Sequence, residues 1–269
     1  MNPFQWFGHY IFDPFFLNPF INLLVGFIKL FELVRIPGAF GFAIVALTAF
    51  IRLALHPFFD QQIQTTKKMH NLKPHLDKLS LKHKQDPKKL QAEQMRLYRE
   101  AGINPASGCL LLIIQMPVFI ALYQTLTLFL THGVSDKILS QINSLLYFPF
   151  LKLQHIDPWF LGFNLILSPQ QSGNWMYYLI PVITGILQYF QVAVTTPSTP
   201  AKALVSPKAT ADKPADKDDF QKSMQTQMKY IFPFMIGWFS FTLPIGLSLY
   251  WNIFSLFSIM QYKKAHSKG

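Results

Sequence analysis

The chain has 269 residues, of which 51% are hydrophobic, 16% aromatic and only 14% charged, and its formal net charge is +11. A soluble domain of this length would carry about 25% charged residues, so the composition argues against a soluble globular protein. The apolar residues also stand in long blocks, which is typical of membrane-spanning helices. Cys109 is the single cysteine, which excludes a disulfide framework and a multi-cysteine metal site.

Residues 1–37 are predicted to form an N-terminal unit outside the cytoplasm that contains a helix lying in the membrane interface. The apolar stretch Asn18–Val34 is interrupted by polar residues that fall on one helical face: Asn22, Gly26, Lys29 and Glu32. A helix divided in this way more often lies in the interface than crosses the membrane. Pro37-Gly38 then ends the segment before the first span.

The first predicted span, about Ala39 to Phe58, carries an arginine, Arg52. A charge at the centre of a span costs roughly 2.5–3.5 kcal/mol, so it is usually tolerated only against other protein or a water-filled cavity. Arg52 lies roughly 20 Å along the helix and about 9 Å from its end, so its side chain could instead bend to the interface. Thr48 and His56 stand four residues to either side and share its face, which favours a wet internal surface.

Residues 59–104 are rich in lysine and arginine, in contrast to the apolar span before them, and are predicted to form a basic helical hairpin in the cytoplasm. Apolar residues recur there at helical spacing, and Asp86-Pro87 marks the start of the second helix. Because loops rich in lysine and arginine stay on the cytoplasmic side, the hairpin is placed there. Its candidate recruiting residues are Lys67, Lys68, Lys73, Lys78, Lys88, Lys89, Arg96 and Arg99.

Two further spans are predicted from about Gly108 to Leu130 and from Trp175 to Val194; the first contains Gln115 and the second Gln188. Residues 131–174 between them hold few basic residues and are expected outside the cytoplasm. Residues 195–227 are rich in Pro, Lys, Asp and Ala, which is typical of a flexible linker, here cytoplasmic.

The last apolar block, Tyr230–Tyr262, is too long for one span: as a single helix it would measure roughly 50 Å, against a hydrocarbon core of about 30 Å. Both the linker before it and the short tail at 263–269 are basic, so both are expected in the cytoplasm and the block must cross an even number of times. We therefore expect two short spans that meet at Pro244. Residues 38–262 then hold five spans, with the N-terminus outside and the C-terminus inside.

The order and spacing of three motifs resemble the YidC/Oxa/Alb family of membrane protein insertases. These motifs are Gly102–Tyr123, Phe241–Asn252 and Met95–Glu100. The resemblance implies an all-α membrane protein with five transmembrane helices, an N-terminal interfacial amphipathic helix and a cytoplasmic helical hairpin. It also implies a non-enzymatic protein without a cofactor, whose spans surround a hydrophilic groove open to the cytoplasm and to lipid.

Arg52 matches the arginine that forms the positive centre of the family's groove, and Gln188 and Trp251 look like groove-lining residues by the same resemblance. Thr48, Gln115 and Asn252 complete the candidate groove. The implied partners are nascent membrane proteins, the ribosome, the Sec translocon and membrane lipids, with no specific DNA, in the plasma membrane of a bacterium. Apolar client helices would leave the groove laterally into lipid.

Two other classes of function are weaker. A small-solute or anion transporter or channel would use Arg52 as its anion site, but the sequence shows no internal inverted repeat. An intramembrane enzyme would need a nucleophile with its base or a cluster of metal ligands, and the spans hold no Asp or Glu.

Overall fold

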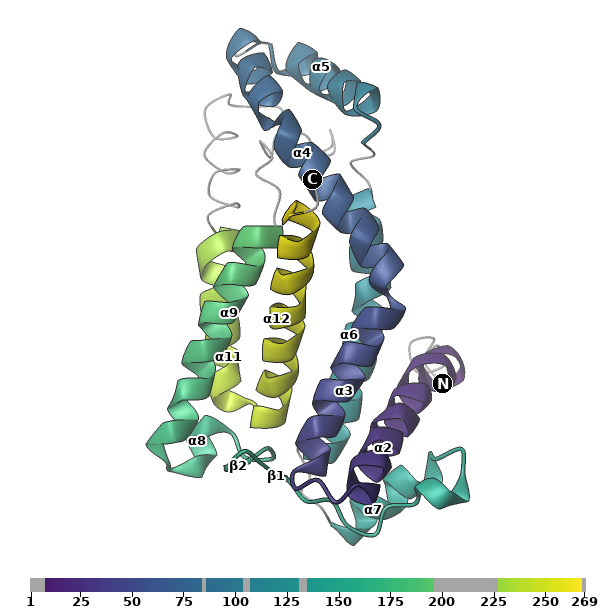
Figure 1. The fold of residues 1–269 in the computed structure, drawn as a ribbon. Helices are drawn as coiled ribbons and strands as arrows, with labels where there is room; N and C mark the ends of the chain where they lie inside the picture. The colour runs from purple at the N-terminus through teal and green to yellow at the C-terminus, as the bar shows by residue number, and fades with distance from the viewer. Residues whose placement is uncertain (1–7, 84–85, 104–106, 131–134, 196–226, 268–269) are drawn as a thin grey trace.

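The computed structural model describes residues 8–83, 86–103, 107–130, 135–195 and 227–267. Long helices form a bundle, and a helical hairpin projects from one end of it (Figure 1). The short elements between residues 136 and 172 lie at the opposite end. The two hydrophilic segments that flank the second span in the sequence are therefore separated by the length of the bundle.

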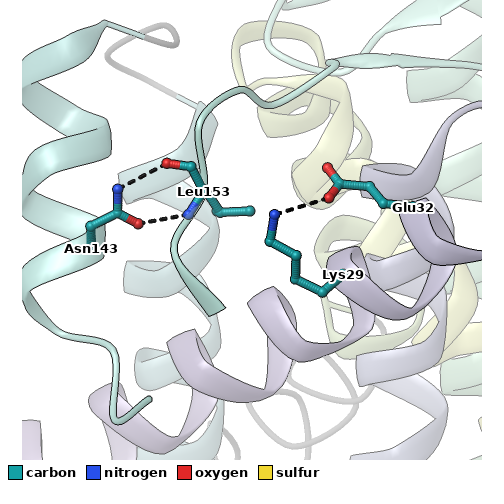
Figure 2. A network of polar contacts seen from close by, with 4 residues as sticks. All are labelled: Lys29, Glu32, Asn143 and Leu153. Atoms are coloured by element: carbon teal, nitrogen blue, oxygen red, sulfur yellow. Dashed lines mark hydrogen bonds and ion pairs between the residues drawn. The ribbon is translucent and has the colours of Figure 1, made fainter. Parts of the chain in front are cut away.

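The N-terminal helix is longer than the sequence predicts, because a π-helical segment, η1 (Gly8–Leu17), runs directly into α2 (Asn18–Leu33). By length and hydropathy, the stretch Phe12–Leu33 is sufficient to cross a membrane. Its interfacial position stays a prediction. Lys29 and Glu32 pair at 3.2 Å on its partly exposed face (Figure 2).

Asn22 does not belong to the exposed polar face of α2 that the sequence predicts. Its side chain is buried, and its Nδ2 donates to the carbonyl of Leu145 at 3.0 Å. Its Oδ1 accepts a hydrogen bond from the backbone nitrogen of Tyr147 at 2.7 Å. Asn22 is therefore polar because it joins α2 to a distant loop, and not because it faces a lipid headgroup.

The first span ends four residues earlier than predicted. Helix α3 (Ala39–Ala54) is followed by a bend of 66°, after which α4 (His56–Lys82) begins. Pro57 lies in the first turn of α4, a position that suits proline because the nitrogens there have no helical partner. The prediction that His56 shares a helical face with Arg52 is therefore wrong, because the two residues lie on different helices. His56 instead pairs with Asp60 at 3.0 Å on an exposed surface.

The projecting hairpin consists of α4 and α5 (Pro87–Glu100). Asp86 caps α5 as predicted, since its Oδ1 accepts a hydrogen bond from the backbone nitrogen of Lys89 at 3.1 Å. Leu76, Tyr98 and Ile103 form a small buried cluster between the two helices. The hairpin thus carries a hydrophobic core of its own beyond the bundle.

The bundle contains α6 (Ser107–Leu130), α9 (Leu179–Thr195), α11 (Phe232–Thr242) and α12 (Ile245–Ser267), together with α3. A short 3₁₀ segment, η3 (Trp175–Tyr178), precedes α9, and together they meet the length and hydropathy of a span. Another short segment, η5 (Gln227–Ile231), leads into α11. The last apolar block divides between α11 and α12 at Pro244, as predicted.

Within the described residues, length and hydropathy alone identify two spanning helices, or three if α3 and α4 are one bent span. Helix α11 has 11 residues and is therefore roughly 16 Å long, about half of the hydrocarbon core. It packs closely on α9: a Cβ added at Gly237 would lie 3.2 Å from the carbonyl of Pro181 and 3.4 Å from the Cα of Gly185. Such small residues let membrane helices approach closely.

The segment between α6 and α9 folds back on the end of the bundle. It contains α7 (Asp136–Ser144), η2 (Pro149–Leu151), the antiparallel strands β1 (Trp159–Phe160) and β2 (Phe163–Asn164), and α8 (Pro169–Ser172). The Asn143 side chain makes two hydrogen bonds to the backbone of Leu153 (Figure 2). Its Nδ2 donates to the Leu153 carbonyl at 2.9 Å, and its Oδ1 accepts from the Leu153 nitrogen at 2.8 Å. Leu151, Leu153 and Leu165 join the main hydrophobic core, so this segment is packed and not a loose loop.

Candidate functional site

Arg52 lies in the last turn of α3, inside the bundle, and its side chain is only 4% exposed. Its terminal nitrogens donate to α12: Nη1 to Gln261 Oε1 at 3.0 Å, and Nη2 to the carbonyl of Phe254 at 3.1 Å and to the hydroxyl of Ser258. The Arg52 side chain therefore binds a neighbouring helix and does not bend away to the interface.

Two aromatic rings enclose the guanidinium. Its central carbon lies 4.2 Å from the ring centroid of Phe59 on α4 and 3.9 Å from that of Phe254 on α12. At these distances the negative faces of the rings attract the cation. The Nε–H group is buried and has no hydrogen-bond partner among the described residues.

No carboxylate of the described residues pairs with Arg52. In the part of the chain that the structure describes, the ion pairs lie elsewhere, in α2, at the start of α4 and in α5. The sequences of α3, α6, α9, α11 and α12 contain no Asp or Glu. A guanidinium keeps its proton in proteins, so the bundle holds a buried cation whose ligands are all neutral.

Thr48 lies next to Arg52 on the inner face of α3 and is buried. Its hydroxyl donates to the carbonyl of Ile44 at 2.7 Å, so its own hydrogen-bonding need is met within α3. Both residues line a small pocket with room for roughly one water molecule. The remaining walls come from α3, α4, α6 and α12: Ile51, Phe59, Val118, Leu122, Tyr250 and Phe254.

Gln188 lies on α9 and faces α12. It is 8% exposed, and its Oε1 accepts a hydrogen bond of 3.4 Å from the Ser255 hydroxyl. The same hydroxyl also lies 2.6 Å from Oε1 of Gln191. These contacts join α9 to α12, and no hydrogen bond joins Gln188 to Arg52 among the described residues.

Trp251 and Asn252 lie on α12 and are partly buried. The indole of Trp251 stacks on the ring of Phe119 of α6, with 6.5 Å between the ring centroids. The Oδ1 of Asn252 is buried without a partner among the described residues. Gln115 belongs to α6, but its side chain lies outside the described part of the structure.

Comparisons with known proteins agree with this architecture. A family model described as "60Kd inner membrane protein" matches residues 32–268. The chain belongs to this family. A crystal structure titled "Active YidC insertase crystal structure with the first transmembrane domain resolved" is similar at 27% identity and a TM-score of 0.52, over 94% of this chain and 46% of that chain. The chain is thus a helical, multi-pass membrane protein with a YidC-like fold.

Relatives in this family come from chloroplasts and from bacteria. The chain is 33% identical over 240 residues to "Inner membrane ALBINO3-like protein 2, chloroplastic" of Chlamydomonas reinhardtii, which covers 88% of this chain and 52% of the relative. It is 30% identical to "Membrane protein insertase YidC" of Chlamydia caviae, over 93% of this chain and 28% of the relative. The chain spans about half the length, or less, of these relatives.

In this member of the 60Kd inner membrane protein family, α12 carries the site residues that sequence reasoning missed. Ser258 and Gln261 bind Arg52, and Ser255 binds the glutamines of α9. The signal was present in the sequence, because Ser248, Ser255 and Ser258 are spaced by seven and three residues and share one helical face. A polar stripe along an apolar span indicates a face buried in protein.

The basic hairpin presents most of its candidate recruiting residues to the surroundings. Lys68, Lys73, Lys78, Lys88, Lys89, Arg96 and Arg99 are exposed, and Lys67 is partly buried. Arg96 is paired within α5, with Glu100 at 2.8 Å and Glu93 at 3.7 Å. The hydrogen bond to Glu100 raises the pKa of Arg96, and these pairs leave Arg96 less free to bind an anionic partner.

Proposed function

We propose that this chain is a membrane protein insertase without enzymatic activity. It would move short hydrophilic segments of nascent membrane proteins past the inner half of the bundle and release their apolar helices laterally into lipid. The observation that carries this proposal is the buried guanidinium of Arg52, which is held by neutral groups alone. Family membership supports the same function, since relatives of this chain are named membrane protein insertases.

The physical problem of insertion explains why such a cation is useful. A polar segment that enters bare lipid leaves its charges and backbone groups unsatisfied, at several kcal/mol per group. Two opposite charges 4 Å apart attract by about 4 kcal/mol at an effective dielectric constant near 20, against about 1 kcal/mol in water. The buried position of Arg52 therefore strengthens its attraction for an acidic client segment.

The proposed groove is lined by residues that surround α12. Arg52 supplies its charge, and its polar and aromatic lining is proposed to come from Thr48, Gln188, Gln115, Trp251 and Asn252. The unpaired Oδ1 of Asn252 supports this role, since a buried amide oxygen without a partner favours contact with water or with a client.

The proposed topology places the N-terminus outside and the hairpin, the 195–227 linker and the basic tail in the cytoplasm. The hairpin and the end of α12 lie at the same end of the bundle, opposite the 136–172 segment (Figure 1), which supports this arrangement. The exposed lysines of the hairpin would recruit ribosomes and nascent clients, with the Sec translocon as a further partner. A bacterial plasma membrane is the proposed location.

Complementation tests the proposal directly. Cells depleted of their own insertase would express this full chain, and insertion of a short membrane protein with an acidic translocated tail would be measured by protease protection. Restored insertion is the expected result. No restoration, with the chain present in the membrane at normal levels, would refute the function.

Substitution of Arg52 tests the electrostatic role. If about 1.4 kcal/mol of the attraction reaches the insertion step, Arg52→Ala should reduce insertion of the acidic client about tenfold. A client with a neutral tail should be affected far less, and Arg52→Lys should retain part of the activity because it keeps the charge but loses the planar fork. Equal loss for both clients would remove the electrostatic role of Arg52 and leave a structural one.

A further inference from the structure

The groups that bind the Arg52 guanidinium all come from one face of α12. The carbonyl of Phe254, the hydroxyl of Ser258 and the amide oxygen of Gln261 stand at spacings of four and three residues. These spacings place the three groups one above another along the helix. A single helix therefore supplies the complete set of hydrogen bonds that the terminal nitrogens of Arg52 make within the described residues.

These ligands fix the position of the guanidinium without cancelling its charge. A neutral oxygen binds a guanidinium less strongly than a carboxylate does, because charge-assisted pairs are shorter and stronger. An arriving carboxylate can therefore replace a neutral ligand. An arriving carboxylate would replace an aspartate or glutamate ligand of Arg52 less readily, because that ligand would itself be charged.

The two side-chain ligands differ in how easily they can leave. Ser258 is 5% exposed and also donates to the carbonyl of Phe254 at 2.9 Å, so it is held on both sides. Gln261 is only partly buried and lies near the end of α12, at the end of the bundle where the hairpin projects (Figure 1). Of the three residues that bind the guanidinium, Gln261 stands nearest the C-terminal end of α12.

We propose that Gln261 and Ser258 form a neutral latch that holds Arg52 in its resting position, and that a client carboxylate displaces Gln261 when it binds. This proposal rests on the proposed function and names the resting partner of its central residue. Ser258 keeps the guanidinium oriented, and Gln261 is the ligand that is exchanged.

The decisive variant is Gln261→Glu, which places a carboxylate where the amide now binds Arg52. A permanent ion pair should then occupy the site. Insertion of the acidic-tailed client should fall by about tenfold relative to a neutral-tailed client in the same depleted cells. Gln261→Ala removes the outer ligand and should keep the acidic-to-neutral ratio at or above that of the wild type.

The matched control is Gln170→Glu, the same chemical change at an exposed position of α8 at the other end of the bundle. It should leave the acidic-to-neutral ratio unchanged. Unfolding of the purified full chain in detergent supplies a readout without any client. Gln261→Glu should raise the unfolding midpoint when Arg52 is present, and should lower it or leave it unchanged in an Arg52→Ala background.

The outcomes separate the latch from the function on which it rests. If the wild type inserts neither client, the proposed function fails and the latch fails with it. If the wild type inserts the acidic client and Gln261→Glu does so within about twofold, the latch is wrong and the function stands. Equal shifts of the unfolding midpoint in the two backgrounds, or loss of both clients in Gln261→Ala, would show that Gln261 has only a structural role.

Discussion

Gly41 allows the β1–β2 hairpin to dock on α3, and its replacement by alanine is a stringent test of that packing. A Cβ built at Gly41 would lie 2.1 Å from Cγ and 2.7 Å from Cβ of Phe160. Phe160 is itself buried in the main core. Real Cβ atoms do not approach other atoms so closely, so either the ring or the whole hairpin must move.

The size of the effect follows from two routes that give similar values. Overpacking of a core position costs about 1–3 kcal/mol, and expelling a buried phenylalanine ring costs roughly 1.5–3 kcal/mol. Alanine regains up to about 1 kcal/mol through its higher helix propensity. We expect Gly41→Ala to destabilise the folded chain by about 1–2 kcal/mol.

Gly26→Ala is the matched control, because Gly26 also lies within a helix and a Cβ there would meet nothing within 4 Å. It should be neutral or should stabilise by about 0.5–1 kcal/mol. The free energy of unfolding of both variants would be measured by denaturant titration of the purified full chain in mixed micelles. In a Phe160→Ala background, Gly41→Ala should lose its cost, as a double-mutant cycle would show. Gly41→Ala as stable as Gly26→Ala would refute the docking of Phe160 on α3.

Three other substitutions probe contacts elsewhere in the bundle. Gly237→Ala should lower the free energy of unfolding by about 1 kcal/mol, because its Cβ would meet backbone atoms of α9, which cannot rotate away as a side chain can. Asn22→Leu should leave two backbone groups of the segment after α7 unpaired, at about 1–3 kcal/mol each, and hydrogen exchange there should accelerate. Asp86→Ala should lower the stability of the start of α5 by about 1 kcal/mol, because it removes the helix cap. Hydrogen exchange should become faster in the first turn of α5 and should stay unchanged in α9. Unchanged exchange in either segment would contradict the corresponding hydrogen bond.

Features that depend on local chemistry could be predicted from the sequence. The break at Pro244 follows from the length of the last apolar block and from the basic residues on its two sides. The start of α5 follows from Asp86 and Pro87, a cap and a first-turn proline. The same local rule explains the error at the end of α3, because Pro57 is also a first-turn proline and marks a new helix.

Contacts between distant parts of the chain could not be predicted in this way. Asn22 lies 123 positions from Leu145, to which it donates, and Arg52 lies 209 positions from Gln261. Periodicity shows that a polar residue shares a face with others, but it does not name the helix that packs on that face. For this reason the sequence pattern places Asn22 on the wrong surface and does not reveal the partners of Arg52 on α12.

Arg52 and Gln188 show why burial alone does not define a functional residue. The two side chains are buried to a similar degree, at 4% and 8% exposure, and both contact α12. Gln188 is uncharged, and hydrogen bonds between membrane helices commonly satisfy such an amide. Arg52 keeps a full charge that none of its neutral ligands compensates, and a charge within a span is costly. Packing therefore accounts for the contacts of Gln188, whereas the uncompensated charge of Arg52 supports the proposal that Arg52 binds an acidic client.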